Sequence, residues 1–174
     1  MKIDRFEGRY SFLSNFYPCK IVHQGITYPS TEHYYVAQKV NDDQIINGKF
    51  YPKADVREMI SNISTPGQVK RFGRTLKLRS DWDNIKLGVM EWCLREKFKE
   101  ENLKEMLLQT GDQELIESNY WHDVVWGVCT CQKCGNKGEN NLGKLLMKIR
   151  SEIKSEQSKR PSLEDVLFPK DSSK

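Results

Sequence analysis

The sequence predicts a mainly α-helical domain of orthogonally packed helices with a small β element near the N-terminus. Apolar residues recur at helical spacing through most of the chain from residue 31 to residue 153. Several of these segments begin with a helix-capping residue or a first-turn proline. Strand-like patterns are confined to the first thirty residues. We therefore expect about six or seven helices and two or three short strands.

The β element is predicted as a hairpin. Residues 21–23 and 26–28 are rich in β-branched and aromatic side chains, and they flank the turn-forming pair Gln24 and Gly25. The preceding residues 12–18 are too interrupted for a regular element, so we expect an ordered loop there. After Pro29 the pattern changes to the helical period.

Two helices in the first half begin with a recognisable cap. Ser30 is expected to cap a helix over residues 31–40, and Thr65 precedes Pro66 in the order typical of a helix start. A further helix is expected to start near Pro52 and to include residues 54–60.

The second half contains the longest predicted helices. Residues 80–83 form a capping-box pattern, and the helix that follows has an apolar stripe of Trp82, Ile85, Val89, Trp92, Cys93 and Phe98. A shorter helix around residues 103–107 ends at Thr110 and Gly111. The last helix, over residues 142–153, is expected to be capped by Asn140 or Asn141.

Length and composition limit the class of protein. The chain has 174 residues, which suits one domain over residues 1–156 and a polar, flexible tail over residues 157–174. No apolar run approaches the roughly 20 residues that span a bilayer, so we expect no membrane partner. The net charge of +4 permits an anionic ligand or a nucleic acid. Five cysteines without a visible secretion signal favour reduced thiols in the cytoplasm.

Glu32 and Lys39 form the first candidate for a reactive pair. They are seven positions apart in a predicted helix, which at about 100° per residue puts them on one face and about 10 Å apart along the axis. Two long side chains at that spacing can close on one small molecule. The alternative is that each charge only complements the dipole at its end of the helix.

Residues 119–127 form a second candidate. The segment holds Asn119, Trp121, Asp123 and Trp126 without a periodic pattern, so we interpret it as a loop. Tryptophan faces can stack on a planar base, and loops commonly contain binding residues. The alternative is that both tryptophans are core anchors beneath a long loop.

Cys129, Cys131 and Cys134 resemble half of a zinc knuckle. A closed tetrahedral site needs four ligands, and only His122 or the distant Cys19 and Cys93 are available to complete it. We interpret these cysteines as unliganded thiols and expect neither a metal nor another cofactor.

Residues 138–144 form the last candidate. A Gly/Asn turn that enters a helix offers free N–H groups to a phosphate, and Lys144 adds a positive charge. The alternative is an ordinary helix cap. The segment lacks the spacing of a P-loop.

The order of these segments resembles one known family. The resemblance begins with Phe-Leu-Ser-Asn-Phe at residues 12–16, continues through residues 29–34 to Lys39, and resumes at residues 66–67, 73–74, 82 and 97–98. It ends with Asp-Val-Val-Trp-Gly at residues 123–127 and with residues 141–150. Together these segments are similar to the NADAR family, also called the YbiA-like N-glycosidases, over about residues 6–150. The cysteine-bearing residues 128–137 depart from the family's general pattern.

The resemblance implies a mostly helical fold and hydrolysis of an N-glycosidic bond. It implies that Glu32, Lys39 and Asp123 are catalytic and that other residues surround the substrate. The expected substrate-binding residues are Ser14, Asn15, Tyr35, Arg74, Asn119, Trp121, Trp126, Asn141 and Lys144. Arg74 or Arg79, together with residues 141–144, is expected to receive a phosphate.

The resemblance implies two classes of substrate. One is ADP-ribose attached to guanine in DNA, which we expect here, and the other is a phosphorylated intermediate of riboflavin biosynthesis. A different class of function also stays open: a non-enzymatic, zinc-assisted nucleic-acid-binding module that uses Cys129, Cys131, Cys134 and His122.

Overall fold

The protein is mainly helical, as the sequence predicts. The computed structural model describes residues 1–159, and this part of the chain contains six α-helices and one 3-10 helix. The 3-10 helix η1 spans Gly8–Leu13, and the α-helices are α1 (Thr31–Ala37), α2 (Lys53–Ser61), α3 (Pro66–Gly73), α4 (Trp82–Lys97), α5 (Glu101–Gln109) and α6 (Asn141–Lys159). The orthogonal packing of these helices stays a prediction.

The strand count was predicted wrongly. The described residues form eight short strands in four separate pairs, rather than two or three strands. The antiparallel pairs are β2 (Pro18–His23) with β3 (Ile26–Ser30) and β4 (Gln44–Ile46) with β5 (Lys49–Tyr51). The parallel pairs are β1 (Lys2–Ile3) with β6 (Glu114–Leu115) and β7 (Ser118–Asn119) with β8 (Val128–Cys129).

Both antiparallel pairs are hairpins with left-handed turns. The predicted hairpin is confirmed: Gln24 and Gly25 have φ of 50° and 79° between β2 and β3. The β4–β5 hairpin turns at Asn47 and Gly48, with φ of 52° and 77°. An Asn-Gly pair is the residue combination that favours this turn, so the signal for the second hairpin was present in the sequence.

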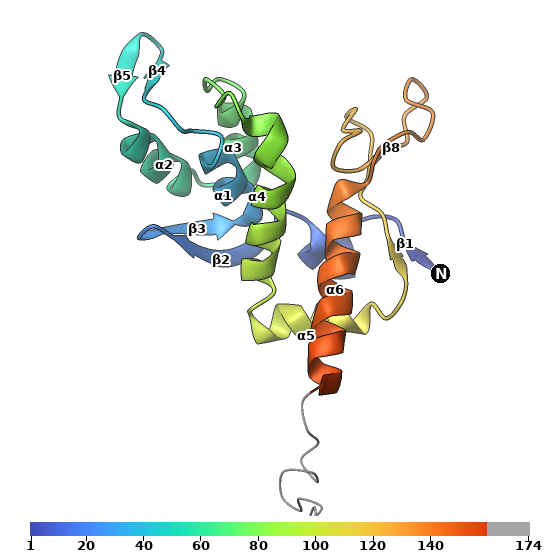
Figure 1. Cartoon of the computed structure of the whole chain (residues 1–174). Helices are drawn as coiled ribbons and strands as arrows, with labels where there is room; N and C mark the ends of the chain where they lie inside the picture. Colours follow the sequence, from blue (N-terminus) through green and yellow to red (C-terminus); the bar gives the residue numbers. More distant parts are fainter. Residues whose placement is uncertain (160–174) are drawn as a thin grey trace, which may run out of the picture.

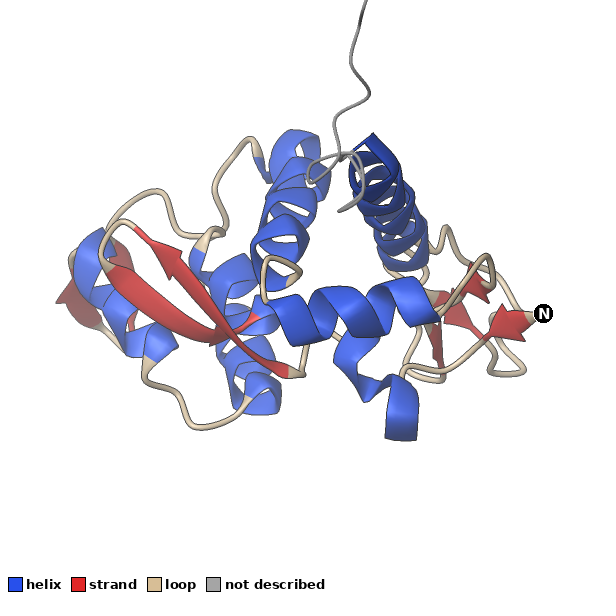
Figure 2. Ribbon diagram, turned by 90° about the horizontal axis from the view of Figure 1, so that it is seen from below, coloured by secondary structure: helices blue, strands red, loops and turns tan. Residues whose placement is uncertain are grey.

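Helix α1 lies at the centre of the fold. All seven of its residues are buried, and it contacts α2, α3, α4 and the β2–β3 hairpin (Figure 1). Figure 2 shows that hairpin on one side of the helices and the short strands near the N-terminus at the other end of the molecule. The chain therefore buries every side of α1, including its polar residues.

The predicted cap of α1 is confirmed, but the predicted end is not. The Ser30 hydroxyl accepts a hydrogen bond from the backbone N–H of His33. The helix ends at Ala37 rather than at residue 40, because the N–H of Lys39 bonds to the carbonyl of Val36, three residues back. This tighter last turn sets the direction in which Lys39 leaves the helix.

Two other predicted helix starts have different outcomes. The Thr65 hydroxyl caps α3 by accepting the N–H of Gln68, with Pro66 in the first turn, as predicted. The prediction of a capping box at residues 80–83 is wrong, because the residue before α4 is Asp81 and its side chain makes no capping hydrogen bond. Its carboxylate instead accepts two hydrogen bonds from Arg79, at 2.5 and 2.9 Å.

Helices α4 and α6 pack against each other beside the centre (Figure 1). The predicted stripe of α4 contributes to the core, with Trp82 and Cys93 buried in it. Helix α6 continues to Lys159, so the tail predicted from residue 157 begins within a helix, and residues 160–174 lie outside the described residues. None of the described helices is long and apolar enough to cross a membrane.

The start of α6 lies against β6. Asn140 donates from its side-chain nitrogen to the Leu115 carbonyl at 2.9 Å and accepts the Glu117 N–H at 3.1 Å. A Cβ added at Gly143 would lie 2.1 Å from that same Leu115 carbonyl oxygen. Glycine at this position therefore allows α6 to approach the strand that leads into residues 117–126.

We predict opposite effects for alanine at two helical glycines. Gly143→Ala is expected to reduce the free energy of unfolding by about 1–3 kcal/mol, because the new methyl group meets backbone. Gly88→Ala in α4 is the matched control: its added Cβ meets nothing within 4 Å, so it is expected to gain up to about 1 kcal/mol from helix propensity. Urea unfolding measures both variants, and a stabilising Gly143→Ala would contradict the close approach.

Candidate functional site

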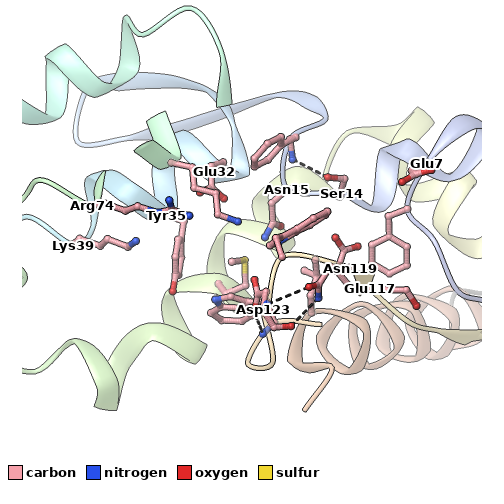
Figure 3. A pocket seen from close by; sticks show the side chains of 18 residues that line it. Glu7, Ser14, Asn15, Glu32, Tyr35, Lys39, Arg74, Glu117, Asn119 and Asp123 are labelled. Atoms are coloured by element: carbon pink, nitrogen blue, oxygen red, sulfur yellow. Dashed lines mark hydrogen bonds between the residues drawn. The ribbon is translucent and has the colours of Figure 1, made fainter. Parts of the chain in front are cut away.

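One cavity brings together most of the residues that the sequence selected. It has a volume of about 320 Å³ and is bounded by α1, α3, α4 and α6 and by residues 14–16 and 117–126. The predicted residues that line it are Ser14, Asn15, Glu32, Tyr35, Lys39, Arg74, Asn119, Trp121, Asp123 and Trp126. Figure 3 shows side chains of α1 facing those of residues 117–126 across this space. Their roles in binding or catalysis stay predictions.

Asn141 and Lys144 lie outside the residues that line the cavity. The N–H groups of Asn141 and Leu142 donate to the carbonyls of Val125 and Trp126, at 3.3 and 3.1 Å. The Asn141 side chain donates to the same Val125 carbonyl at 2.8 Å, and Lys144 is exposed. Because this helix start already bonds within the protein, it is not the open phosphate site that we expected.

Glu32 is the most deeply enclosed acid of the cavity. It lies in the first turn of α1 and is only 7% exposed. Its backbone N–H donates to the Asn15 carbonyl at 3.0 Å, which joins α1 to residues 14–16. Burial raises the pKa of the Glu32 carboxyl, whereas the nearby charges of Lys70 and Lys39 lower it. The carboxyl therefore holds a proton more tightly than an exposed glutamate does.

Lys39 reaches the same cavity from the end of α1. Its Nζ lies 5.2 Å from the centre of the Tyr35 ring and 5.9 Å from that of Trp82. Burial lowers the pKa of Lys39, and the Glu32 carboxylate raises it. An amine in such surroundings holds its proton less tightly than an exposed lysine, which suits proton donation or nucleophilic attack.

Lys70 is a cavity residue that the sequence analysis missed. It lies on α3, and its Nζ is 5.8 Å from the ring centre of Trp121 and 5.9 Å from that of Phe16. The signal was present, because Lys70 precedes Arg74 by four residues and positions four apart share a helix face.

The Asp123 carboxylate organises the turn that follows it. One of its oxygens accepts the N–H groups of Val125 and Trp126, at 3.2 and 2.9 Å. Asn119, only 1% exposed, forms two hydrogen bonds with the Asp123 backbone, at 2.7 and 3.1 Å. Asn119 thus holds the loop in place, and Asp123 fixes the position of Trp126.

The two tryptophans of this loop have different positions. Trp126 packs edge-on against Tyr35, with ring centres 5.4 Å apart and planes at 87°. Trp121 is 57% exposed. Trp126 is therefore part of the wall, whereas Trp121 lies at the rim, where a ligand can cover it.

Glu117 is a second residue that the sequence analysis missed. It lines the cavity, and burial, followed by the negative charge of Asp123, raises the pKa of its carboxyl to about 7. Among the described residues, the buried atoms Glu117 Oε2 and Asn15 Oδ1 have no hydrogen-bond partner. Buried polar atoms are normally paired, so a ligand or water in the cavity is the expected partner.

Residues 14–16 are held from beneath by a buried lysine. Lys97 is only 1% exposed and donates to the Ser14 carbonyl at 2.8 Å. Burial lowers the pKa of this amine to about 8. The Ser14 hydroxyl in turn accepts the Phe16 N–H at 3.1 Å. This pairing fixes the part of the cavity that contacts Glu32.

Apart from Glu32 on α1, the charges around the cavity are separated by sign. Lys39 and Arg74 lie on the α1 and α3 side, and Glu7, Glu117 and Asp123 lie on the opposite side (Figure 3). Arg79, the alternative phosphate ligand, pairs with Asp81 and does not line the cavity. The site therefore suits a ligand with an anionic group at one end and hydrogen-bond donors at the other.

We predict a pH-dependent difference in stability between the wild-type protein and Glu117→Gln. A carboxyl whose pKa rises from its ordinary 4.5 to about 7 on folding binds a proton in the native state that the unfolded state lacks. Its stabilising contribution is therefore complete below pH 4.5 and is lost as the pH rises through about 7. Urea unfolding from pH 5 to 8 should show the wild type losing up to about 1.4 kcal/mol per pH unit relative to the variant. Parallel pH profiles would contradict the raised pKa.

The chain is similar to several known proteins. The family model described as the NADAR domain matches residues 4–154. The N-glycosidase YbiA of Escherichia coli (strain K12) is 34% identical over 151 residues, which cover 85% of this chain and 84% of that protein. An N-glycosidase of Nostoc punctiforme is 37% identical over 149 residues, or 84% of this chain and 87% of that one.

Another relative is much longer. A riboflavin biosynthesis protein of Vibrio vulnificus is 36% identical over 150 residues, and the match covers 84% of this chain but only 36% of that protein. Among solved structures, the NMR structure of the E. coli protein YbiA superimposes with a TM-score of 0.73 and 32% identity, covering 94% of this chain and 89% of that one. Both the family match and the level of identity show that the chain belongs to the NADAR domain family.

Proposed function

We propose that the protein is an N-glycosidase that hydrolyses the bond between a ribose and a nitrogenous base. The observation that carries the proposal is that the Glu32 carboxyl and the Lys39 amine line one cavity together with two tryptophans and a set of cations. The names of the relatives, N-glycosidase and riboflavin biosynthesis protein, support the same reaction class. We expect the reaction to take place in the cytoplasm.

Glu32 is proposed to act at the anomeric carbon. As the ribose–nitrogen bond breaks, positive charge develops on that carbon, and a carboxylate beside it stabilises the charge. The same carboxylate can orient a water molecule and accept its proton as the water attacks. Because Glu32 is buried, this charge acts in surroundings where few water molecules screen it.

Lys39 is proposed to assist the leaving base. In one route its ammonium donates a proton to the departing nitrogen, and water attacks the sugar directly. In the other, the neutral amine attacks the anomeric carbon as the bond to the base breaks, and the proton that the resulting ammonium loses passes to the departing base. Water later cleaves the sugar–lysine bond and returns the free amine. The lowered pKa of Lys39 suits both routes.

The remaining residues are proposed to position the substrate. Trp121 can stack on the base, with Trp126 behind it in the wall, a contact worth roughly 1–3 kcal/mol in proteins that bind single-stranded nucleic acids. Lys70 and Arg74 are the proposed phosphate ligands, in place of residues 141–144. Asp123 and Glu117 face the other end, where an amino group of a base can donate to a carboxylate.

The proposed substrate is ADP-ribose attached to guanine in DNA. Its diphosphate suits the cationic side of the cavity, and guanine has amino and ring N–H groups for the acidic side. The net charge of +4 is compatible with DNA as the partner. The similarity to a riboflavin biosynthesis protein favours a second candidate, a ribosylaminopyrimidine phosphate from that pathway. This molecule also has a phosphate at one end and a base with amino groups at the other.

We predict that Glu32→Gln and Lys39→Ala remain folded but each lose at least about 100-fold in the single-turnover rate of base release, the range of general acid–base catalysis. Lys144→Ala is the matched control. It removes a lysine outside the cavity, so its rate should equal that of the wild type. Chromatography of the released base measures the single-turnover rate of each of the three variants. A wild-type rate in Glu32→Gln would remove Glu32 from the mechanism.

The two substrates are separated by direct assay. Wild-type protein is incubated with DNA that carries ADP-ribosylated guanine and, separately, with the ribosylaminopyrimidine phosphate. Release from the DNA substrate, with an affinity that falls steeply as salt rises, is the expected result. Release from the pyrimidine alone would transfer the proposal to the second candidate, and release from neither by folded protein would contradict the N-glycosidase assignment.

A further inference from the structure

Four side chains with metal-binding atoms meet beside the cavity. They are His122, which follows β7, Cys129, which ends β8, and Cys131 and Cys134 in the next turn. The imidazole Nδ1 and the three Sγ atoms all lie within 4.8 Å of one another. The loops that contain them lie around β8, near the start of α6 (Figure 1). The fold thus supplies the fourth ligand that the sequence spacing alone left open.

The separations of these atoms, none above 4.8 Å, are close to those of a tetrahedral zinc site. With Zn–S of about 2.3 Å and Zn–N of about 2.0–2.1 Å, tetrahedral ligands lie roughly 3.8 Å apart for two sulfurs and roughly 3.6 Å apart for nitrogen and sulfur. His122 Nδ1 lies 3.2 Å from Cys134 Sγ and 3.4 Å from Cys131 Sγ. Cys129 Sγ lies 4.0 Å from the same nitrogen and 3.4 Å from Cys131 Sγ.

The backbone around the cysteines has the form of a metal-binding turn. The Cys134 N–H donates to the Cys131 sulfur at 3.3 Å, and the Gly135 N–H donates to the Cys131 carbonyl at 2.9 Å. Gly135 has φ of +62°, which permits this tight turn. N–H groups aimed at a sulfur are the outer-shell hydrogen bonds that stabilise a metal-bound thiolate.

The hydrophobic core does not account for these thiols. Cys129 is 0% exposed, yet it is absent from the core cluster of buried apolar residues, whereas the equally buried Cys93 belongs to that cluster. Cys129 instead packs against Cys131 and His122. Cys129 is therefore buried outside the hydrophobic core cluster, next to two of the other candidate ligands.

We propose that His122, Cys129, Cys131 and Cys134 bind one zinc ion. Three thiolates and an imidazole are a typical ligand set for zinc. All four positions are filled by protein, so the ion is structural and does not contact substrate. A bound zinc ion would replace the unliganded thiols that we expected, and the proposed site stands independently of the proposed N-glycosidase activity.

The ion would add a further link between two segments that already pair as β7 and β8. His122 lies between Trp121 and Asp123, both of which line the cavity, and the cysteines lie on the far side of Gly127 in sequence. Zinc would hold the loop of the rim tryptophan against the turn at residues 131–135. Its loss should therefore loosen residues 119–137 more than the helices.

The test is the metal content of the full-length protein, purified without a metal-affinity tag and measured by inductively coupled plasma mass spectrometry. About one zinc per chain is expected. Cys131→Ser and Cys134→Ser should each lose it, whereas Cys19→Ser, a matched control at a thiol outside the cluster, should retain it. Circular dichroism checks that each variant is folded.

Hydrogen exchange tests the structural consequence. Amides of residues 119–137 should exchange faster in Cys131→Ser than in the wild type, while those of α4 stay unchanged. If residues 119–137 exchange at the same rate in Cys131→Ser and in the wild type, zinc does not hold the rim of the cavity in place.

Two results would overturn the site: folded wild type that binds no zinc even after reconstitution, or zinc retained in both serine variants. If those variants do not fold, cobalt titration of the wild type replaces them. Thiolate-to-cobalt charge-transfer bands with tetrahedral d–d bands are expected, and their absence would overturn the proposal.

Discussion

The burial of one carboxyl group, that of Glu32, is the constraint on which the site depends. A buried acid is costly unless charges or hydrogen bonds compensate it, and here Lys39 and Lys70 supply the opposite charge. Helix α1 can hold the acid in place because neighbouring elements cover all of its residues. The elements that pack around α1 thus form both the core of the fold and one wall of the cavity.

The other wall is a loop that hydrogen bonds between side chains and backbone hold in place. Asn119 and Asp123 fix a loop that has little regular structure, and Gly127 allows it to approach residue 117, where an added Cβ would lie 2.1 Å from a carbonyl oxygen. Lys97 likewise holds residues 14–16 in place by donating a hydrogen bond to the Ser14 carbonyl. The proposed zinc ion extends this arrangement, since it would fix the one part of the loop that carries the exposed Trp121.

Local signals in the sequence predicted the elements that local interactions decide. The caps at Ser30 and Thr65 and the turn at Gln24–Gly25 each depend on residues close in sequence. The parallel pair of β1 and β6 was not predictable in this way, because its strands are more than a hundred residues apart in the sequence. Helical spacing and the family resemblance selected most residues of the cavity. Glu117 was missed because only the folded chain shows that it is buried beside Asp123.

A crystal structure with ADP-ribose bound tests the central claim most directly. We predict that the anomeric carbon of the terminal ribose lies between the Glu32 carboxyl and the Lys39 Nζ, beneath Trp121, with the diphosphate near Lys70 and Arg74. ADP-ribose bound at another surface, or in this cavity with its ribose out of reach of both Glu32 and Lys39, would contradict the account.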